Sequence, residues 1–449
     1  MPKILEIING FVWGAPALIL ILGVGIYLSV RTGFPQITLF LKALRQFCNR
    51  LLHRQESESS FRCLCTALAA TVGTGNLAGV AGALSLGGPG AIFWMWVSGF
   101  FGMATKYAEA TLAVRYRIRQ KGENRGGPMY IISGGLGNRW SILAGFYCLS
   151  GVLASFGVGN ATQINTLIAA SGSMIRSFGF QPGRIWNLVL GAVVAGAVYG
   201  AMLGGGSQIG RTAERLIPFA AGGYILLCMV VLGLRFRQIP QAFVSIFTGA
   251  FSPRAVTGGM LGSAFTALRT GCSRGVFTNE AGMGTAAIAH GGAEVDHPVQ
   301  QGLMGIMEVF LDTIVICTMT ALVILVSGVA VPYGTDAGAV LTEAAFVRVL
   351  GRGASVFLTA AISCFAFATV LGWGLYGARC LEYLLGVPVW KGYALTMSGV
   401  ALLGAAVETG PVWILADICN GLMAIPNLFT LAMLTAEVRR LTIDYRKTG

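Results

Sequence analysis

Long apolar runs recur along almost the whole chain, and most are long enough to cross a lipid bilayer as a helix. A spanning helix needs about 20 residues, because the hydrocarbon layer is about 30 Å thick and each residue adds about 1.5 Å. Only 11% of the residues are charged, whereas soluble domains carry about 25%. The sequence therefore predicts an all-α integral membrane protein with about eleven transmembrane helices. The predicted spans are 11–30, 61–86, 90–115, 141–170, 185–205, 214–234, 259–289, 299–329, 353–385, 389–408 and 411–437.

The placement of the basic residues explains the formal net charge of +13. A nucleic-acid-binding protein would gather them in one patch or stripe, but here they fall in the segments between the apolar runs. The loop after the first span, every second loop after it and the C-terminal end, with the adjoining ends of the spans, together hold 20 lysines and arginines, whereas the other loops and the N-terminal segment hold 8. Cytoplasmic loops of membrane proteins show this enrichment. We therefore predict a multi-pass protein in a lipid bilayer with its N-terminus outside and its C-terminus in the cytoplasm, and no nucleic-acid partner.

Two predicted spans contain interruptions that a simple spanning helix does not need. Span 61–86 holds Gly73-Thr-Gly-Asn76, and span 259–289 is rich in glycine, serine and threonine. If the first span is set aside, each interruption lies in the first of five spans. Paired interruptions in two halves are typical of transporters built from inverted repeats. We predict a single domain over 1–449, with a first helix and basic inner loop at 1–60, repeats at 61–236 and 237–440, and a cytoplasmic tail at 441–449.

The interruptions also predict what such a site binds. Irregular backbone at membrane depth is tolerated where it lines a cavity or meets a ligand. The N-terminus of a half-helix attracts a carboxylate, and unwound carbonyl oxygens suit a hard cation such as Na⁺. Close helix packing is the alternative explanation for glycines at such places. Asn76 argues against packing alone, because a polar amide within a membrane span is costly.

Four groups of motifs, spread over most of the chain, point to a known family. They are Gly73-Thr-Gly-Asn-Leu-Ala-Gly79 with Gly87–Trp96 and Gly102–Glu109; Arg274-Gly-Val-Phe-Thr-Asn-Glu-Ala-Gly282 with Ala289-His290, His297–Gly302 and Phe310-Leu-Asp-Thr313; Phe365–Trp373 with Tyr376–Tyr383; and Ala416-Asp417 with Asn420–Asn427. With these motifs the chain resembles the alanine/glycine:cation symporter family, also called sodium:alanine symporters. The resemblance implies a leucine-transporter-like fold with one extra helix before a five-plus-five inverted repeat. It further implies uptake of alanine, glycine or similar small amino acids, driven by Na⁺ or sometimes H⁺, across the bacterial inner membrane.

The resemblance also implies roles for particular residues at the substrate site. By analogy with that fold, Gly73, Thr74, Gly75 and Asn76 surround the substrate carboxylate. Gln163 is similar to the family's polar partner for the substrate amine, although a hydrogen bond between helices explains it nearly as well. Three hydroxyl residues of the second broken span complete the predicted lining, and two of them are spaced i,i+4 on one helix face. These residues are Ser263, Thr266 and Thr270.

For the coupling ion, the resemblance implies carbonyl oxygens around Ala69 and Val72 and the hydroxyl of Thr369. The family usually has Ser-Thr where this chain has Ala368-Thr369. One oxygen ligand is therefore missing from the expected set. Two alternatives remain: a water molecule completes the Na⁺ site, or H⁺ is the coupling ion instead of Na⁺. No other cofactor is expected.

Several polar residues within the predicted spans have both a functional and a structural explanation. Glu280 and Asp312 match family motifs, and each either relays protons or joins a polar network, with Arg274 as a nearby partner. Glu109 follows Lys106 by three residues, which favours a local ion pair. His290, Glu294 and His297 have no recognised zinc spacing, so we predict no transition-metal site.

Two other classes of protein are considered for such a chain. An intramembrane enzyme is disfavoured because the sequence has no His-Glu-x-x-His and no Gly-x-Ser-x-Gly motif. A channel is disfavoured because no filter sequence is repeated. We therefore expect a secondary symporter and not an enzyme.

Overall fold

Helices make up most of the chain in the computed structural model, which describes residues 2–52, 58–120, 122–251, 264–406 and 410–448. One short hairpin departs from the all-α prediction, with β1 (Ile118–Gln120) antiparallel to β2 (Glu123–Arg125). The α-helices are α1 (Pro2–Val12), α2 (Ala15–Thr32), α3 (Pro35–Thr38), α4 (Phe40–Leu52), α5 (Glu58–Thr71), α6 (Val80–Gly87), α7 (Gly90–Arg115), α8 (Pro128–Ile131), α9 (Ser141–Phe156), α10 (Thr162–Ser177), α11 (Arg184–Leu203), α12 (Gly205–Leu234), α13 (Ile239–Phe251), α14 (Ala264–Asn279), α15 (Thr285–His290), α16 (Pro298–Val309), α17 (Thr318–Ser327), α18 (Gly338–Leu350), α19 (Gly353–Leu385), α20 (Trp390–Ala406), α21 (Gly410–Met433) and α22 (Thr435–Thr448).

Short π-helical and 3-10 segments connect several of these helices. The π-helical segments are η1 (Gly75–Gly79), η2 (Ile132–Leu136), η4 (Gly157–Ala161) and η6 (Phe310–Cys317), and the 3-10 segments are η3 (Asn138–Trp140) and η5 (Phe236–Gln238). π-helical turns inside helices are frequent at functional sites. Here η1 continues the first interrupted span and packs against η6.

Six helices of the described residues are long and apolar enough to cross a membrane, or up to eight if each of two bent pairs counts as one span. The predicted number of about eleven is not confirmed. One reason is that α20 is only 17 residues long. Another is that α7, with 26 residues, carries Lys106 and Glu109 in its second half. The six are Ile7–Thr32, Asn138–Ser177, Arg184–Leu203, Gly205–Leu234, Pro298–Ser327 and Gly353–Leu385.

Both predicted interruptions are present. In the first span, Ser59–Thr71 and Gly75–Gly87 are bent by 51° relative to each other. In the second, α14 ends at Asn279 and α15 begins at Thr285. Between these two helices, Glu280 has a φ of 53°, and Gly282 and Gly284 have φ values of 95° and 79°. Glycine adopts this left-handed conformation freely, whereas a glutamate there is uncommon and indicates a constrained backbone.

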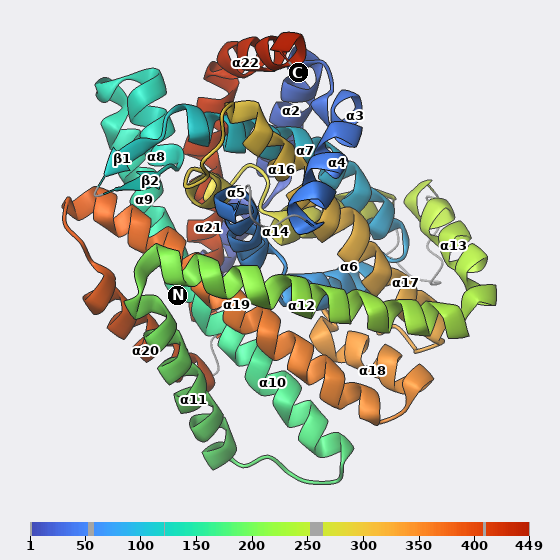
Figure 1. The fold of residues 1–449 in the computed structure, drawn as a ribbon. Helices are drawn as coiled ribbons and strands as arrows, with labels where there is room; N and C mark the ends of the chain where they lie inside the picture. The colour runs from blue at the N-terminus through green and yellow to red at the C-terminus, as the bar shows by residue number, and fades with distance from the viewer. Residues whose placement is uncertain (1, 53–57, 121, 252–263, 407–409, 449) are drawn as a thin grey trace.

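The first broken helix, formed by α5 and α6, lies between two groups of helices (Figure 1). On one side α7 packs against α14 and α16, and on the other α19 packs against α9, α10 and α12. Helix α5 contacts both α12 and α19, while α6 contacts α7 and α14. The first break is therefore placed where the two groups meet.

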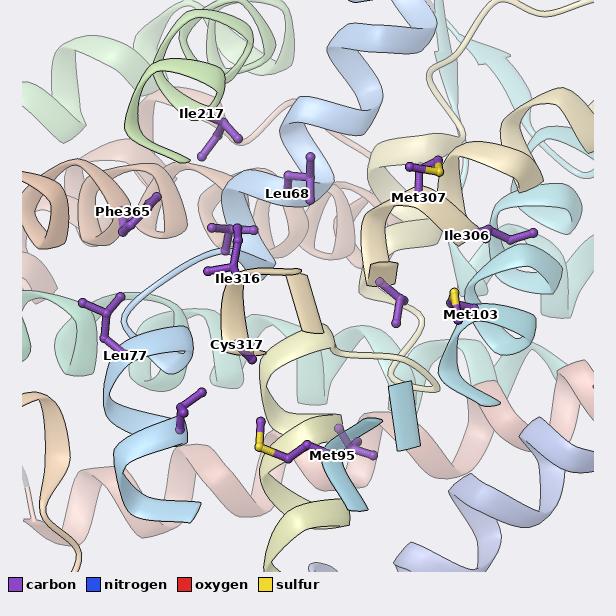
Figure 2. Packing of buried hydrophobic residues seen from close by; sticks show 14 of the residues in the cluster. Leu68, Leu77, Met95, Met103, Ile217, Ile306, Met307, Ile316, Cys317 and Phe365 are labelled. Atoms are coloured by element: carbon purple, nitrogen blue, oxygen red, sulfur yellow. The ribbon is translucent and has the colours of Figure 1, made fainter. Parts of the chain in front are cut away.

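Apolar side chains from both groups surround the first break (Figure 2). Leu68 on α5 and Leu77 on η1 are buried beside Met95 on α7, Ile316 on η6 and Phe365 on α19. Since lipid is as apolar as leucine, such a core is held together by close packing and by polar contacts between helices. The polar contacts gather around the two interruptions.

Candidate functional site

The backbone of the first broken helix leaves the regular hydrogen-bonding pattern at Gly73. In a continuous α-helix the Gly73 N–H would donate to the Ala69 carbonyl, but it donates to Oδ1 of Asn76 over 2.9 Å. The Asn76 N–H would likewise donate to the Val72 carbonyl, but it donates to the Gly73 carbonyl over 3.3 Å. The carbonyl oxygens of Ala69 and Val72 have thus lost their helical donors.

A threonine hydroxyl from α19 lies against this unwound backbone. Thr369 is 2% exposed, and among the described residues its Oγ1 has no hydrogen-bond partner. A Cβ added at Gly73 would lie 2.6 Å from that oxygen. Helices α5 and α19 approach each other closely here, because Gly372 packs directly on Ala70. A Cβ at Gly372 would lie only 2.9 Å from the Ala70 nitrogen. A buried polar atom without a partner is rare in proteins and calls for a ligand or a water.

A cavity of about 340 Å³ borders the same break. Its wall includes Thr74 and Gly75 at the break, Gln163 on α10 and Phe277 on α14. Thr74 donates from Oγ1 to Oε1 of Gln163 over 2.8 Å, and Gln163 donates from Nε2 to the Val158 carbonyl over 3.1 Å. The amide oxygen keeps a second lone pair, so it can also accept a hydrogen bond from an ammonium group.

Further lining residues of the cavity come from α14, from Asp336 and from the start of α18. Arg274 donates to Asp336 over 2.7 Å, and both residues line the cavity. Thr342 of α18 donates to the Leu77 carbonyl over 3.0 Å, which holds α18 against η1. Arg274, which is near Glu280 in sequence, is therefore directed to Asp336 and not to Glu280.

Glu280 instead has uncharged hydrogen-bond partners. It accepts from Oγ1 of Thr285 over 2.7 Å and from Nε1 of Trp373 over 3.0 Å. Six residues of helix separate it from Arg274 by about 9 Å along the axis. The bond to Trp373 connects the second break with α19, which also carries Thr369.

A chain of hydrogen bonds joins the two breaks. Asn76 donates from Nδ2 to Oδ1 of Asp312 over 2.7 Å, and Oδ2 of the same carboxylate accepts from Thr313 over 2.9 Å. Asn279 donates to the Thr313 hydroxyl over 3.0 Å and accepts from the Ala281 N–H over 2.9 Å. Through Asn76, which also caps Gly73, the unwound backbone of the first span is linked to that of the second.

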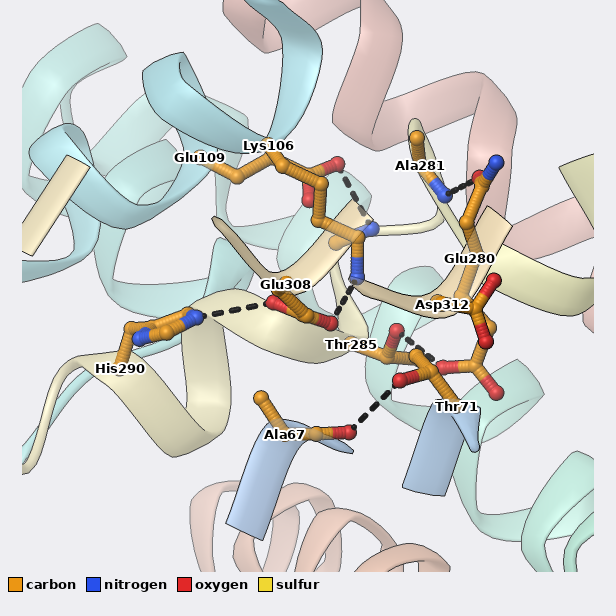
Figure 3. A network of polar contacts seen from close by, with 12 residues as sticks. Ala67, Thr71, Lys106, Glu109, Glu280, Ala281, Thr285, His290, Glu308 and Asp312 are labelled. Carbon is orange, nitrogen blue, oxygen red and sulfur yellow. Dashed lines mark hydrogen bonds and ion pairs between the residues drawn. The ribbon is translucent and has the colours of Figure 1, made fainter. Parts of the chain in front are cut away.

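A second polar cluster lies on the other side of the second break (Figure 3). Lys106 forms an ion pair with Glu308 over 2.8 Å, and His290 contacts the other oxygen of Glu308 over 2.9 Å. Oε1 of Glu109 accepts from the N–H groups of Gly282 and Gly284, over 3.0 and 3.1 Å. The predicted local pair of Lys106 with Glu109 is thus wrong: α7 directs Lys106 to α16 and Glu109 to the second break.

Of the three hydroxyl residues predicted on the second broken span, the two that the structure describes do not line the cavity at the first break. Ser263 lies outside the described residues. Thr270 packs against the far end of α6, because a Cβ at Gly87 would lie 3.0 Å from the Thr270 Cβ, and Thr266 lies one turn earlier. Ten residues of helix, about 15 Å, separate Thr270 from the second break. Arg274 and Phe277, which the sequence did not assign to the site, line the cavity and lie closer to the break.

The fold and the site define a class of protein: secondary transporters with a ligand site between two discontinuous helices. A solved structure, that of MhsT in complex with L-phenylalanine, has the same fold with a TM-score of 0.59 at 13% sequence identity, covering 86% of this chain and 98% of that one.

The chain belongs to the sodium:alanine symporter family, whose model matches residues 1–449. It is 44% identical to the sodium/alanine symporter AgcS of Methanococcus maripaludis, over 97% of this chain and 95% of the relative. It is also 35% identical to the probable sodium/glutamine symporter GlnT of Bacillus subtilis, over 100% of this chain and 92% of that protein.

Proposed function

We propose that this chain is a symporter that couples the uptake of alanine, or a similarly small neutral amino acid such as glycine, to Na⁺. The observation that carries the proposal is the buried Thr369 hydroxyl, which has no hydrogen-bond partner among the described residues and lies against the unwound backbone at Gly73. The named function of the relative AgcS supports the choice of both ligands. Another relative is named for glutamine, whose side chain is longer than that of alanine. The size of the substrate must therefore be tested on this chain directly.

The substrate lies in the cavity beside the first break. Thr74 and Gly75 present backbone at the start of η1, where N–H groups and the helix dipole favour a carboxylate. Gly73 contributes only to the shape of the break, because its N–H already donates to Asn76. Gln163 faces the substrate amine with the free lone pair of its amide oxygen. Asn76 acts differently from its predicted role, because both ends of its amide are already used, by Gly73 and by Asp312. It shapes the substrate site by holding the break open.

Na⁺ lies between α5 and α19. The carbonyl oxygens of Ala69 and Val72 lack their helical donors, and the Thr369 hydroxyl supplies a third oxygen. Hard cations prefer oxygen ligands of this kind. Ala368 brings no oxygen, so the protein offers one ligand fewer than the family pattern. A cation at this place binds both the broken helix and its neighbour, which couples ion binding to the geometry of the substrate site.

A second candidate for the coupling ion is H⁺. Glu280 and Asp312 are buried next to the two breaks, and the hydrogen bonds that they accept come from Thr285, Trp373, Asn76 and Thr313, none of which is charged. A carboxyl group in such surroundings can change its protonation state when the helices around it move. The distribution of basic residues among the loops favours one orientation in the bacterial inner membrane, with the N-terminus outside and the C-terminus in the cytoplasm.

Uptake of radiolabelled alanine into proteoliposomes tests these proposals. An inward Na⁺ gradient and an inward H⁺ gradient are imposed separately, and glycine and glutamine are tested as competitors. Concentrative uptake under a Na⁺ gradient alone supports the sodium symporter. Concentrative uptake under an H⁺ gradient alone indicates that H⁺ is the coupling ion and that Glu280 and Asp312 are the candidate proton-binding groups. Passive uptake that ignores both gradients refutes coupled transport.

A further inference from the structure

A surface pocket on α12, which shares no lining residue with the substrate cavity, has the chemistry of a lipid site. Its lining residues are Gln208, Arg211, Thr212, Arg215, Leu216, Phe219 and Phe367, and its volume is about 650 Å³. Arg211, Arg215 and Phe219 are spaced i,i+4 and therefore lie above one another on one face of α12. All three are exposed, and α19, which contributes Phe367, packs alongside α12 (Figure 1).

The length of α12 places these residues relative to the bilayer. From Leu216 to Leu234 the helix has no charged residue, and this stretch rises by about 28 Å, close to the hydrocarbon thickness of about 30 Å. The residues before Leu216 therefore lie at the membrane interface, with Arg215 at its edge. Phe219 lies one turn further, at the depth of acyl chains.

Neither of these two arginines has an acidic partner among the described residues. Within the described part of the chain, neither Arg211 nor Arg215 takes part in an ion pair or a hydrogen bond. The acid between them, Glu214, is buried on the side of α12 that packs against α5, and it pairs with Arg62 of α5 over 3.1 Å. Like charges four residues apart on a helix repel each other, so an anion bound between them removes an unfavourable interaction.

We propose that this pocket binds one anionic phospholipid, whose phosphodiester group lies between Arg211 and Arg215 and whose acyl chain lies along Leu216, Phe219 and Phe367. Arginine guanidinium groups recognise phosphate with paired donors, and basic pockets at the cytoplasmic end of membrane helices bind anionic lipid headgroups. A soluble anion would use the arginines but would leave the apolar half of the pocket empty.

The test is native mass spectrometry of the full-length protein with dioleoyl phosphatidylglycerol and dioleoyl phosphatidylcholine at equal concentrations. The wild type is expected to retain one phosphatidylglycerol in preference to phosphatidylcholine. Arg211→Gln with Arg215→Gln should weaken that preference about 30-fold, since each basic residue near an anionic lipid contributes about fivefold. Phe219→Ala should weaken the retention of both lipids.

The same helix offers a matched control at its other end. Arg235→Gln with Arg237→Gln removes the same charge from the region after Leu234 and should leave the lipid preference unchanged. Equal loss in the two double variants, or equal retention of the two lipids by the wild type, overturns the proposal. Single substitutions of Arg211 and Arg215, each expected to lose about fivefold, serve if the double variant fails to fold.

Discussion

Replacing Thr369 with valine tests the proposed cation site at a single atom, because it removes one hydroxyl and keeps the shape of the side chain. In the structure that oxygen is buried and lies against Gly73. A polar contact with a charged group contributes about 1.5–3 kcal/mol. Because 1.4 kcal/mol corresponds to a factor of ten, the Na⁺ concentration for half-maximal uptake should rise about 10- to 100-fold.

The same substitution should have a different effect on the sodium-free protein. A buried polar group without a partner costs about 1–3 kcal/mol, and the Thr369 hydroxyl has no partner among the described residues. Valine removes that cost, so the Tm measured without Na⁺ should stay constant or rise. The stabilisation that Na⁺ gives the wild type should become smaller in the variant.

Both effects are measurable on one preparation. The Na⁺ dependence of alanine uptake is measured in proteoliposomes, and thermal unfolding is followed in detergent with and without Na⁺. Thr369→Ser keeps the hydroxyl and should remain close to wild type in its Na⁺ dependence. An unchanged Na⁺ dependence in the valine variant, or a lower Tm without Na⁺, refutes the reasoning.

Three further perturbations examine the contacts around the breaks. Asn76→Ala removes the cap on Gly73 and the donor to Asp312. It should lower alanine uptake about 5- to 150-fold, by loss of about 1–3 kcal/mol, at unchanged membrane expression; normal uptake would show that Asn76 does not shape the site. Thr313→Val interrupts the chain of hydrogen bonds between the breaks and should slow uptake while alanine binding, measured by calorimetry, persists; Thr313→Ser should restore the rate, and equal rates in the two variants argue against the chain. Lys106→Met leaves Glu308 buried without its lysine, which typically costs about 3–5 kcal/mol, so Tm should fall clearly; adding Glu308→Gln should recover part of the loss, and no recovery contradicts an ion-pair explanation.

The sequence predicted the second break, but two of the residues that it assigned to the cavity wall, Thr266 and Thr270, do not line the cavity. Thr266 and Thr270 have the right chemistry and a shared helix face, yet they lie near the start of α14. Periodicity tells which residues share a face, but it does not tell how far along the helix a neighbouring element crosses. Arg274 and Phe277, one to two turns before the break, border the cavity instead.

The buried charges show the same limit. Lys106 and Glu109 are three residues apart, so a local pair is the natural expectation from sequence. The side chains nevertheless separate, with Lys106 bound to Glu308 and Glu109 bound to backbone N–H groups at Gly282 and Gly284. Inside a membrane protein each buried charge takes the partner that best compensates its desolvation, and that partner comes from another helix.

The sequence by itself determined the membrane character, the two interruptions and the family, because apolar length, helix-breaking residues and local motifs are properties of contiguous residues. It also indicated Ala69, Val72 and Thr369 together, through the resemblance. Only the tertiary structure decided that the Asn76 side chain accepts the Gly73 N–H, which would otherwise bond to the Ala69 carbonyl, and that Thr369 faces the unwound backbone at this point. Those contacts depend on where α19 crosses the unwound segment, and a crossing point is fixed by the packing of the whole helix assembly.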